Sequence, residues 1–193
     1  TDTYCNGYYD ESRGDYPYTL LSGADDPIPD VLIGRISVRN ITELETVINK
    51  IIKYEQATYM ESFNSWYERA LLSANSIYIY SQISSLTTNQ SIEYMMTNFG
   101  MEDVMLFVGT TYDDELVAQL EQGILYYNHR DTNGGGDINS NDFDSANNGP
   151  QLPFITMITC GTNYFHWSSV IEYSVKVGTP SSPKGSIAAV GMN

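Results

Sequence analysis

A histidine and a cysteine, His129 and Cys160, are the residues of this chain whose types and positions best suit chemistry. Each comes at the end of an apolar run that is typical of a buried strand: residues 124–127 precede Asn128 and His129, and residues 153–159 precede Cys160. In an open α/β sheet, ligands and reacting groups gather outside the carboxyl ends of the strands, so we expect the two side chains to face one crevice. A thiol beside an imidazole is the arrangement that a cysteine nucleophile and its general base require.

Strands that alternate with helices must position this pair. Apolar runs predict strands at residues 31–37, 70–74, 103–108, 124–127, 153–159 and 186–191. Spacing and end signals predict helices at residues 88–98, 113–122 and 168–177. This order implies βαβ units, so we predict an α/β domain whose mainly parallel sheet has helices on both faces. The first 30 residues are rich in Tyr, Gly, Asp and Pro and are predicted to be an irregular lead-in.

A further helix is predicted after residue 42. The sequence Thr42-Glu43-Leu44-Glu45 has the pattern of a capping box, in which the first and last side chains bond each other's backbone amides. Aliphatic residues then recur at helical spacing as far as Ile52, and they should form one buried stripe of a helix that runs to about Thr58.

Length and charge exclude several classes of function. The 193 residues fit one domain, and 24 Asp and Glu against 9 Lys and Arg give a formal charge of −15. So acidic a chain is a poor ligand for nucleic acid, which we do not expect as a partner. No apolar run approaches the roughly 20 residues that cross a bilayer, so no membrane span is expected. The 16 Tyr and scarce Lys favour a secreted or cell-surface protein, and two cysteines are too few for a disulfide framework.

An acidic loop offers a possible calcium site. Oxygen-bearing side chains alternate along residues 137–144, as they do in calcium loops, and the candidate ligands are Asp137, Asn139, Asp142 and Asp144. The loop is not an EF-hand, because its sixth position is an aspartate where the EF-hand has glycine. A solvated loop without metal is the other interpretation of the same pattern.

Four blocks of sequence, in chain order, carry a resemblance to a known family. They run from Asp30 to Ser37, from Gly123 to His129, from Gln151 to Gly161 and from Gly185 to Gly191. In these blocks the chain resembles the gingipain family of secreted bacterial cysteine peptidases, which belongs to the caspase-like clan. The resemblance implies a caspase-like three-layer fold. It also implies that residues 1–193 are the catalytic subdomain of a larger secreted protein, whose remaining domains would be partners of this chain.

The resemblance implies a role for each residue around the histidine and cysteine. Cys160 would be the nucleophile and His129 the general base, and the backbone amides of Arg130 and Cys160 would stabilise the oxyanion. The family's acidic residue, which orients the histidine, corresponds to Asn75, whose side chain could accept the imidazole N–H and fix the tautomer. The reaction would be hydrolysis of a protein or peptide substrate. It requires no cofactor, although members of the family bind calcium.

Tyr164 and Trp167 follow Cys160 closely and could line the substrate pocket. Packing in the core is the alternative role for such aromatic side chains. Both residues are retained as pocket candidates.

Two other functions fit the same residues. The family carries Gly-His-Gly at the base, whereas this chain has Asn128, His129 and Arg130. With Asn75 in the acidic position, these residues would also suit a peptidase fold that has lost catalysis and serves as a surface binding or structural module. A transpeptidase or sorting enzyme would use the same cysteine and histidine but pass the acyl group to an amine.

Overall fold

The structure is a computed structural model, which describes residues 16–22, 26–56, 65–75, 81–131, 136–163 and 169–192. The chain separates into two compact units, Thr1–Ser37 and Val38–Asn193. The candidate catalytic residues all belong to the second unit.

In the first unit, one aspartate organises a turn. A short 3-10 helix, η1 (Tyr16–Thr19), is followed by the amides of Leu21 and Ser22, which donate to the Asp30 carboxylate over 2.7 and 3.0 Å. These hydrogen bonds lower the pKa of Asp30. The strand predicted at residues 31–37 does not form, so that prediction is wrong. Apolar side chains in this run are exposed, and Leu32 is fully exposed. A run of hydrophobic residues therefore was not enough to predict a strand here, because the segment pairs with no other strand in the described part of the chain.

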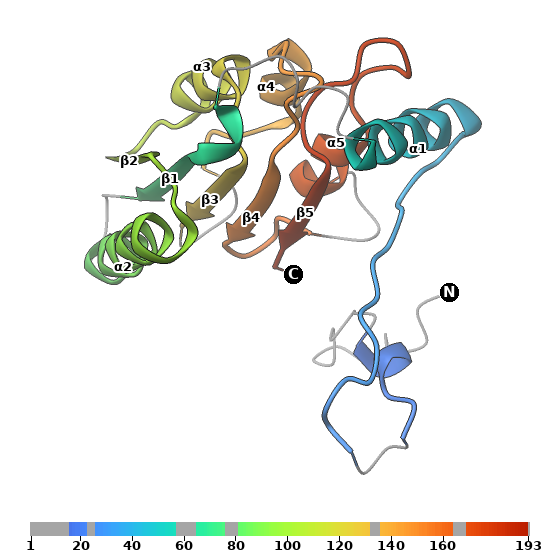
Figure 1. Ribbon diagram of the computed structural model, residues 1–193, viewed down its shortest axis with the longest axis horizontal. Helices are drawn as coiled ribbons and strands as arrows, with labels where there is room; N and C mark the ends of the chain where they lie inside the picture. The colour runs from blue at the N-terminus through green and yellow to red at the C-terminus, as the bar shows by residue number, and fades with distance from the viewer. Residues whose placement is uncertain are drawn as a thin grey trace. The chain divides into compact units, whose positions relative to one another are not determined.

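A five-stranded parallel sheet forms the centre of the second unit. In spatial order, the strands are β2 (Asp103–Gly109), β1 (Arg69–Asn75), β3 (Tyr126–Arg130), β4 (Phe154–Ile158) and β5 (Ala188–Gly191), as Figure 1 shows. Every neighbouring pair is parallel. The carboxyl ends of all five strands therefore lie along one edge of the sheet.

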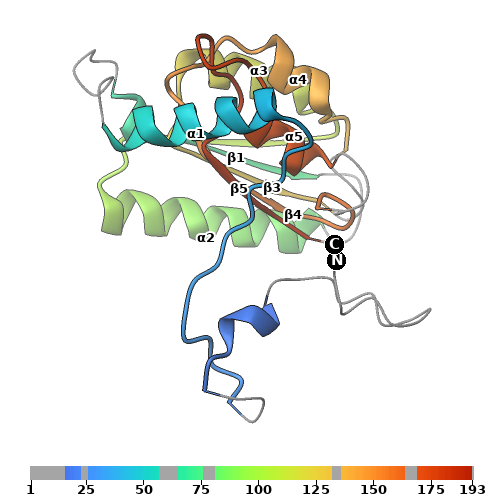
Figure 2. The ribbon, with the colours of Figure 1, turned by 90° about the vertical axis from the view of Figure 1, so that its right-hand side faces the viewer.

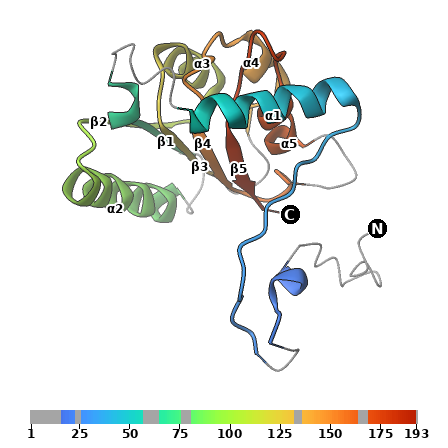
Figure 3. The same ribbon diagram turned by 45° about the vertical axis from the view of Figure 1, so that its right-hand side comes forward.

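Helices cover both faces of the sheet. On one side lie α1 (Ile41–Glu55), α3 (Asp113–Gln122), α4 (Ser140–Ser145) and α5 (Val170–Lys176), and on the other lies α2 (Ser81–Phe99) (Figures 2 and 3). A 3-10 helix, η2 (Trp66–Glu68), leads into β1. The predicted α/β class, with a parallel sheet between layers of helices, is confirmed. Helix α2 is longer than the expected 88–98 and packs on β1 and β2.

The main core lies between the sheet and the helices α3, α4 and α5. Of the described residues, 13 that are buried belong to it. The strands contribute Leu71, Tyr127, Ile155 and Met157 to it. Apolar side chains on alternate strand positions thus meet the helices, which is what a sheet buried on this face requires.

Helix α1 forms where it was predicted, but its cap and its buried face differ. The N-cap is Asn40, whose side chain accepts from the amide of Glu43 over 2.9 Å, so the capping box at Thr42 is wrong. Asparagine is among the best N-cap residues, which explains why the helix begins at Ile41 and not after Thr42. The buried residues are Thr46, Val47 and Lys50. The expected aliphatic stripe is largely exposed, at Leu44, Ile48 and Ile52.

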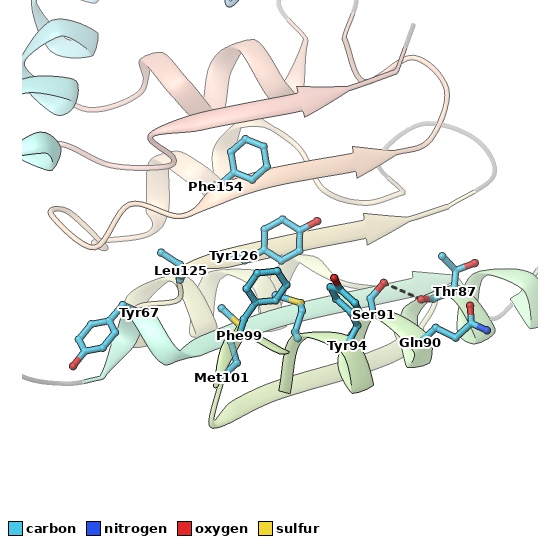
Figure 4. Close-up of a pocket in the computed structure, with 11 residues that line it drawn as sticks. Tyr67, Thr87, Gln90, Ser91, Tyr94, Phe99, Met101, Leu125, Tyr126 and Phe154 are labelled. Carbon is cyan, nitrogen blue, oxygen red and sulfur yellow. Dashed lines mark hydrogen bonds between the residues drawn. The ribbon is translucent and has the colours of Figure 1, made fainter. Parts of the chain in front are cut away.

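A cavity of about 890 Å³ lies between α2 and the sheet (Figure 4). Its walls include Tyr94 and Phe99 from α2 and Tyr126 and Phe154 from the sheet. Tyr126 and Phe154 are the first residues of β3 and β4, so the cavity opens near the amino ends of these strands. It therefore lies at the opposite end of the strands from His129 and Cys160. None of the helices in the described part of the chain has the length and hydropathy needed to cross a membrane.

Candidate active site

His129 is the last residue but one of β3, and its side chain is fully buried. The strand therefore extends past the apolar run that ends at Tyr127. Side chains alternate across a strand, so His129 points to the same face as Tyr127, toward the main core. The imidazole meets the ring of Tyr112 edge to face, with 4.8 Å between ring centroids. Packing on this face fixes the plane of the imidazole.

Two hydroxyl groups lie in line with one nitrogen of the imidazole. His129 Nδ1 is 2.8 Å from Ser73 Oγ, and Ser73 Oγ is 2.9 Å from the hydroxyl of Tyr127. The parallel register explains the contact, because Ser73 of β1 pairs with His129 of β3. Sequence reasoning missed Ser73, although a lone hydroxyl within the apolar run at residues 70–74 is a signal that a buried partner is needed.

The other nitrogen faces a carboxylate. Among the described residues, His129 Nε2 has no hydrogen-bond partner, and Asp131 Oδ2 lies 3.7 Å from it. Asp131 is itself buried and accepts a 2.7 Å hydrogen bond from Asn75 Nδ2 through its other oxygen. Asn75 thus contacts the carboxylate rather than the imidazole. The direct hydrogen bond expected between Asn75 and His129 is not present, because Ser73 occupies Nδ1 and Asp131 lies next to Nε2.

Cys160 lies two residues beyond the end of β4 and is exposed. Gly161, the next residue, has φ = 76°, a left-handed conformation that glycine adopts without strain, and it turns the chain away from the strand. The hydroxyl of Thr162 donates to the carbonyl of Thr159 over 3.0 Å and accepts from the amide of Met192 over 3.2 Å. The turn that carries the thiol is therefore tied to the chain that leaves β5.

The histidine and the cysteine come from adjacent strands and the same edge of the sheet. His129 pairs with Met157, so the thiol lies three residues further along β4 and its turn. The structure holds no hydrogen bond between the imidazole and the thiol: Nδ1 contacts Ser73, and Nε2 has no partner among the described residues. The backbone amide of Cys160, one of the expected oxyanion donors, likewise has no hydrogen bond in the described part of the chain.

The bulky residues on either side of His129 point away from it. Alternation along β3 places Asn128 and Arg130 on the face that α2 covers. The Asn128 side chain accepts a 2.8 Å hydrogen bond from Thr156 Oγ1, which is 2.6 Å from the hydroxyl of Tyr126. The two residues that depart from Gly-His-Gly therefore lie on the face of the sheet opposite the imidazole. Arg130, the other expected oxyanion residue, ends β3 opposite Ile158.

Two tyrosines beside the imidazole are firmly protonated. Burial raises the pKa of both Tyr112 and Tyr127, and the charges of Asp131 and Asp137 raise the pKa of Tyr112 further. The hydroxyl of Tyr112 donates to the carbonyl of Gly109 over 2.7 Å. Both phenols are therefore hydrogen donors at neutral pH.

The candidate calcium ligands serve as caps and turns. Both oxygens of Asp137 accept from the amide of Tyr112 over 3.0 Å, ahead of α3. Asn139 is the N-cap of α4 and forms a capping box with Asp142, whose pKa is raised by burial. Asp144 is exposed. Among the described residues, no three His, Cys, Asp or Glu side chains are grouped closely enough to hold a metal, and the calcium site stays a prediction.

The two pocket candidates, Tyr164 and Trp167, lie outside the described residues. Their predicted role therefore stays a prediction.

Comparison with known proteins gives one family and one fold. The family model described as peptidase family C25 matches residues 3–193. Two solved structures are similar: the Arg-specific cysteine proteinase gingipain R (RgpB), at 22% identity and a TM-score of 0.75, and the complex of Porphyromonas gingivalis RgpB pro- and mature domains, at 21% identity and a TM-score of 0.76. Each match covers 92% of this chain but only 43% and 44% of the other, so the chain spans less than half the length of these proteins. No curated protein sequence matches.

Proposed function

The chain belongs to peptidase family C25, and from this premise we propose that it cleaves peptide bonds with Cys160 as the nucleophile and His129 as the general base. The observation that carries the proposal is the position of these residues on neighbouring strands. Cys160 is exposed just beyond β4, and His129 is the last residue but one of β3, which pairs directly with β4. Ligands bind at this edge in open α/β sheets, so a peptide laid across it would reach the thiol.

The reaction proceeds in two stages. The Cys160 thiol proton passes to His129, and the thiolate attacks the carbonyl carbon of the peptide bond, forming a C–S bond. The C–N bond then breaks, and His129 returns the proton to the departing amine. Water next attacks the thioester and gives a proton to His129. The C–S bond breaks, the acid product leaves, and the proton returns to the thiolate.

We propose that a backbone amide beside the thiol stabilises the intermediate. The N–H of Cys160 has no hydrogen-bond partner in the described residues and comes from the same residue as the thiol. An unbonded amide at this position supports its role as a donor to the oxyanion that forms on the carbonyl oxygen. We propose the amide of Arg130 as the second donor.

The burial of His129 favours a second candidate, a binding or structural module without catalysis. A fully buried ring whose Nδ1 already contacts Ser73 is also what a histidine retained for packing would show. This module would keep the fold but not activate the thiol. The two functions therefore differ in the reactivity of Cys160.

Alkylation of the thiol distinguishes these functions. The folded protein is treated with iodoacetamide at neutral pH, and the modified peptide is identified by mass, which separates Cys160 from Cys5. For a peptidase we expect faster modification than in the urea-unfolded chain, and a loss of that advantage in His129→Asn. If Cys160 reacts no faster in the folded protein than in the unfolded chain, the module is correct and the peptidase is not.

The location and the partners of the protein follow as proposals from the same family. We propose that it acts outside the cell on protein or peptide substrates, as its acidic, Tyr-rich composition favours. One similar structure is a complex of pro- and mature domains. By analogy, the remaining parts of a precursor are its proposed protein partners.

A further inference from the structure

Three buried side chains form a continuous line that ends at the imidazole. The hydroxyl of Tyr127 lies 2.9 Å from Ser73 Oγ, which lies 2.8 Å from His129 Nδ1. All three residues are at most 1% exposed. The hydrogen positions in this line are therefore set by the protein, because no solvent reaches it.

The direction of the hydrogens follows from Tyr127. Burial raises the pKa of this phenol, so it keeps its proton. Within the described part of the chain, the one hydrogen-bond partner of its hydroxyl is Ser73 Oγ. Tyr127 must then donate to Ser73, because a buried O–H without an acceptor is costly. The hydrogen of Ser73 is left to point at His129, so Nδ1 accepts it and carries no hydrogen itself.

The opposite side of the ring leads independently to the same tautomer. Nε2 lies 3.7 Å from Asp131 Oδ2. A lone pair on Nε2 would face the carboxylate and be repelled, whereas an N–H there is attracted to it. The neutral imidazole therefore has its hydrogen on Nε2.

We propose that Ser73 and Tyr127 are positioning residues that hold His129 as the Nε2–H tautomer with its Nδ1 lone pair occupied. In this tautomer Nδ1 is the nitrogen that remains to accept a proton, and Ser73 competes with the Cys160 thiol for it. This last step rests on the proposed peptidase function. His129 is thus at rest while Ser73 donates to it, and it becomes a base when that hydrogen bond opens.

Nitrogen NMR tests the tautomer without any assay of activity. The chain has two histidines, so ¹⁵N-histidine labelling gives two rings, and His129→Gln identifies which signals belong to His129. The spectrum is recorded at about pH 8.5, and the neutral ring is the form whose tautomer it reports. We expect a pyrrole-type Nε2 and a pyridine-type Nδ1. A hydrogen on Nδ1, or an even mixture of tautomers, would overturn the proposal.

Three variants separate positioning from a structural role. In the Asp131→Asn background, where the charge beside Nε2 is gone, Tyr127→Phe frees Ser73 to accept, so the population should shift toward Nδ1–H. In Ser73→Thr, which keeps the hydroxyl, the tautomer should stay Nε2–H. An unchanged tautomer in the double variant would contradict the relay. In Ser73→Ala, Nδ1 is released to the thiol.

The link to the thiol is measured separately. Loss of one neutral hydrogen bond should raise the rate of alkylation of Cys160 in Ser73→Ala by about threefold to tenfold, with no change in Ser73→Thr. If Ser73→Ala reacts no faster, Ser73 does not compete with the thiol, and that step is wrong. If the tautomer is as expected but wild-type Cys160 reacts no faster than in the unfolded chain, the positioning role stands and the peptidase proposal fails.

Discussion

At the scale of single residues, Asn75 and Asp131 together supply the amide and the carboxylate that lie near His129. The carboxylate comes from Asp131, beside His129 Nε2, and Asn75 donates to it over 2.7 Å. The amide therefore satisfies one oxygen of a buried carboxylate and leaves the other toward the imidazole. The carboxylate near the ring thus directly follows β3, and the amide that orients it ends β1.

Replacing the amide with a second carboxylate tests this arrangement. In Asn75→Asp, the donor to Asp131 is lost and two carboxylates face each other, so we expect the free energy of unfolding to fall by about 1–3 kcal/mol at neutral pH. The repulsion raises the pKa values of the pair, so the loss should shrink as pH falls and one carboxyl takes up a proton. Urea unfolding at about pH 5 and about pH 8 measures both effects. Asn147→Asp makes the same charge change at an exposed position and should cost little at either pH.

The sequence was enough to locate the candidate histidine and cysteine, but it did not predict which side chains contact them. His129 and Cys160 were located by apolar runs, because a strand end is marked by the residues that precede it. The contact of Ser73 with His129 depends on the register of β1 and β3, and no periodicity in a single strand states the register of its neighbour. Asp131 was missed for a similar reason, since it lies two residues beyond His129 in a segment that predicts only a loop.

At the scale of elements, Asn148 fastens the connection before β4 to the turn before β5. Its side chain donates to the carbonyl of Gly185 over 2.7 Å and accepts from the amide of Gly185 over 2.9 Å. It also donates to the carbonyl of Gln151 over 3.2 Å, and it is 2% exposed. Gly185 has φ = 76°, and a Cβ at this position would collide with the carbonyl oxygen of Ser174, so only glycine fits this turn.

Truncation of this side chain should loosen both connections. In Asn148→Ala, the backbone groups of Gly185 lose their partner while buried, so we expect the free energy of unfolding to fall by about 2–3 kcal/mol. The neighbouring Asn147→Ala removes an exposed amide and should change it by less than about 0.5 kcal/mol. Urea unfolding of both variants makes the comparison. Equal losses in the two variants would show that Asn148 contributes no more than an exposed residue.

Helix α1 is joined to the rest of its unit by a buried lysine. Lys50 Nζ donates to the carbonyls of Val175 and Ser186 over 2.7 and 3.5 Å, and Lys50 is 2% exposed. Burial lowers the pKa of Lys50 to about 7 from its ordinary value of 10.5. Between these two values the unfolded chain binds more protons than the folded one, so this group makes stability rise with pH.

Lys50→Met removes that pH dependence. From about pH 7 to about pH 9.5, the free energy of unfolding of the wild type should rise relative to Lys50→Met by about 2–3 kcal/mol. Urea unfolding of both proteins at the two pH values gives the difference between their free energies of unfolding. The contributions of all other titrating groups cancel in this difference, because both proteins contain them. Lys53→Met, one turn along the same helix, removes a lysine that bonds the carbonyl of Pro180 and should keep the wild-type slope. A parallel slope in Lys50→Met would mean that Lys50 stays charged when buried.

Sequence patterns predicted the sheet correctly but not the segment at residues 31–37 or the buried face of α1. The parallel sheet followed from apolar runs that alternate with helices, because both faces of such a sheet must be covered. The run at residues 31–37 has the same character but pairs with no strand, since hydrophobicity records a preference for burial and not the position of a partner. In α1, the helical pattern predicted a buried face of aliphatic residues, but Lys50 is buried there instead. Its Nζ can be buried because it donates hydrogen bonds to one carbonyl of α5 and to one in the turn before β5.

At the scale of the whole molecule, the net charge of −15 governs the response to cations. Repulsion among 24 acidic side chains opposes the compact state, so any cation that screens them should raise the melting temperature. A specific calcium site would add to this effect through binding to the folded chain alone. The oxygens of Asp137 and Asp142 are already engaged by backbone amides, which argues that screening acts alone.

Calcium and magnesium should therefore stabilise the protein alike. At equal concentrations of the two chloride salts we expect melting temperatures within about 1 °C of each other, both above that of the chelator-treated protein, because divalent cations of equal charge screen equally. Differential scanning calorimetry makes the measurement, and Asp137→Asn, which keeps an oxygen for the amide of Tyr112, serves as the matched variant. An excess shift with calcium that disappears in Asp137→Asn would show that the acidic loop rearranges to bind the ion. Equal shifts in both proteins would leave the loop as the structure has it, a pair of caps that place α3 and α4 over the imidazole face of the sheet.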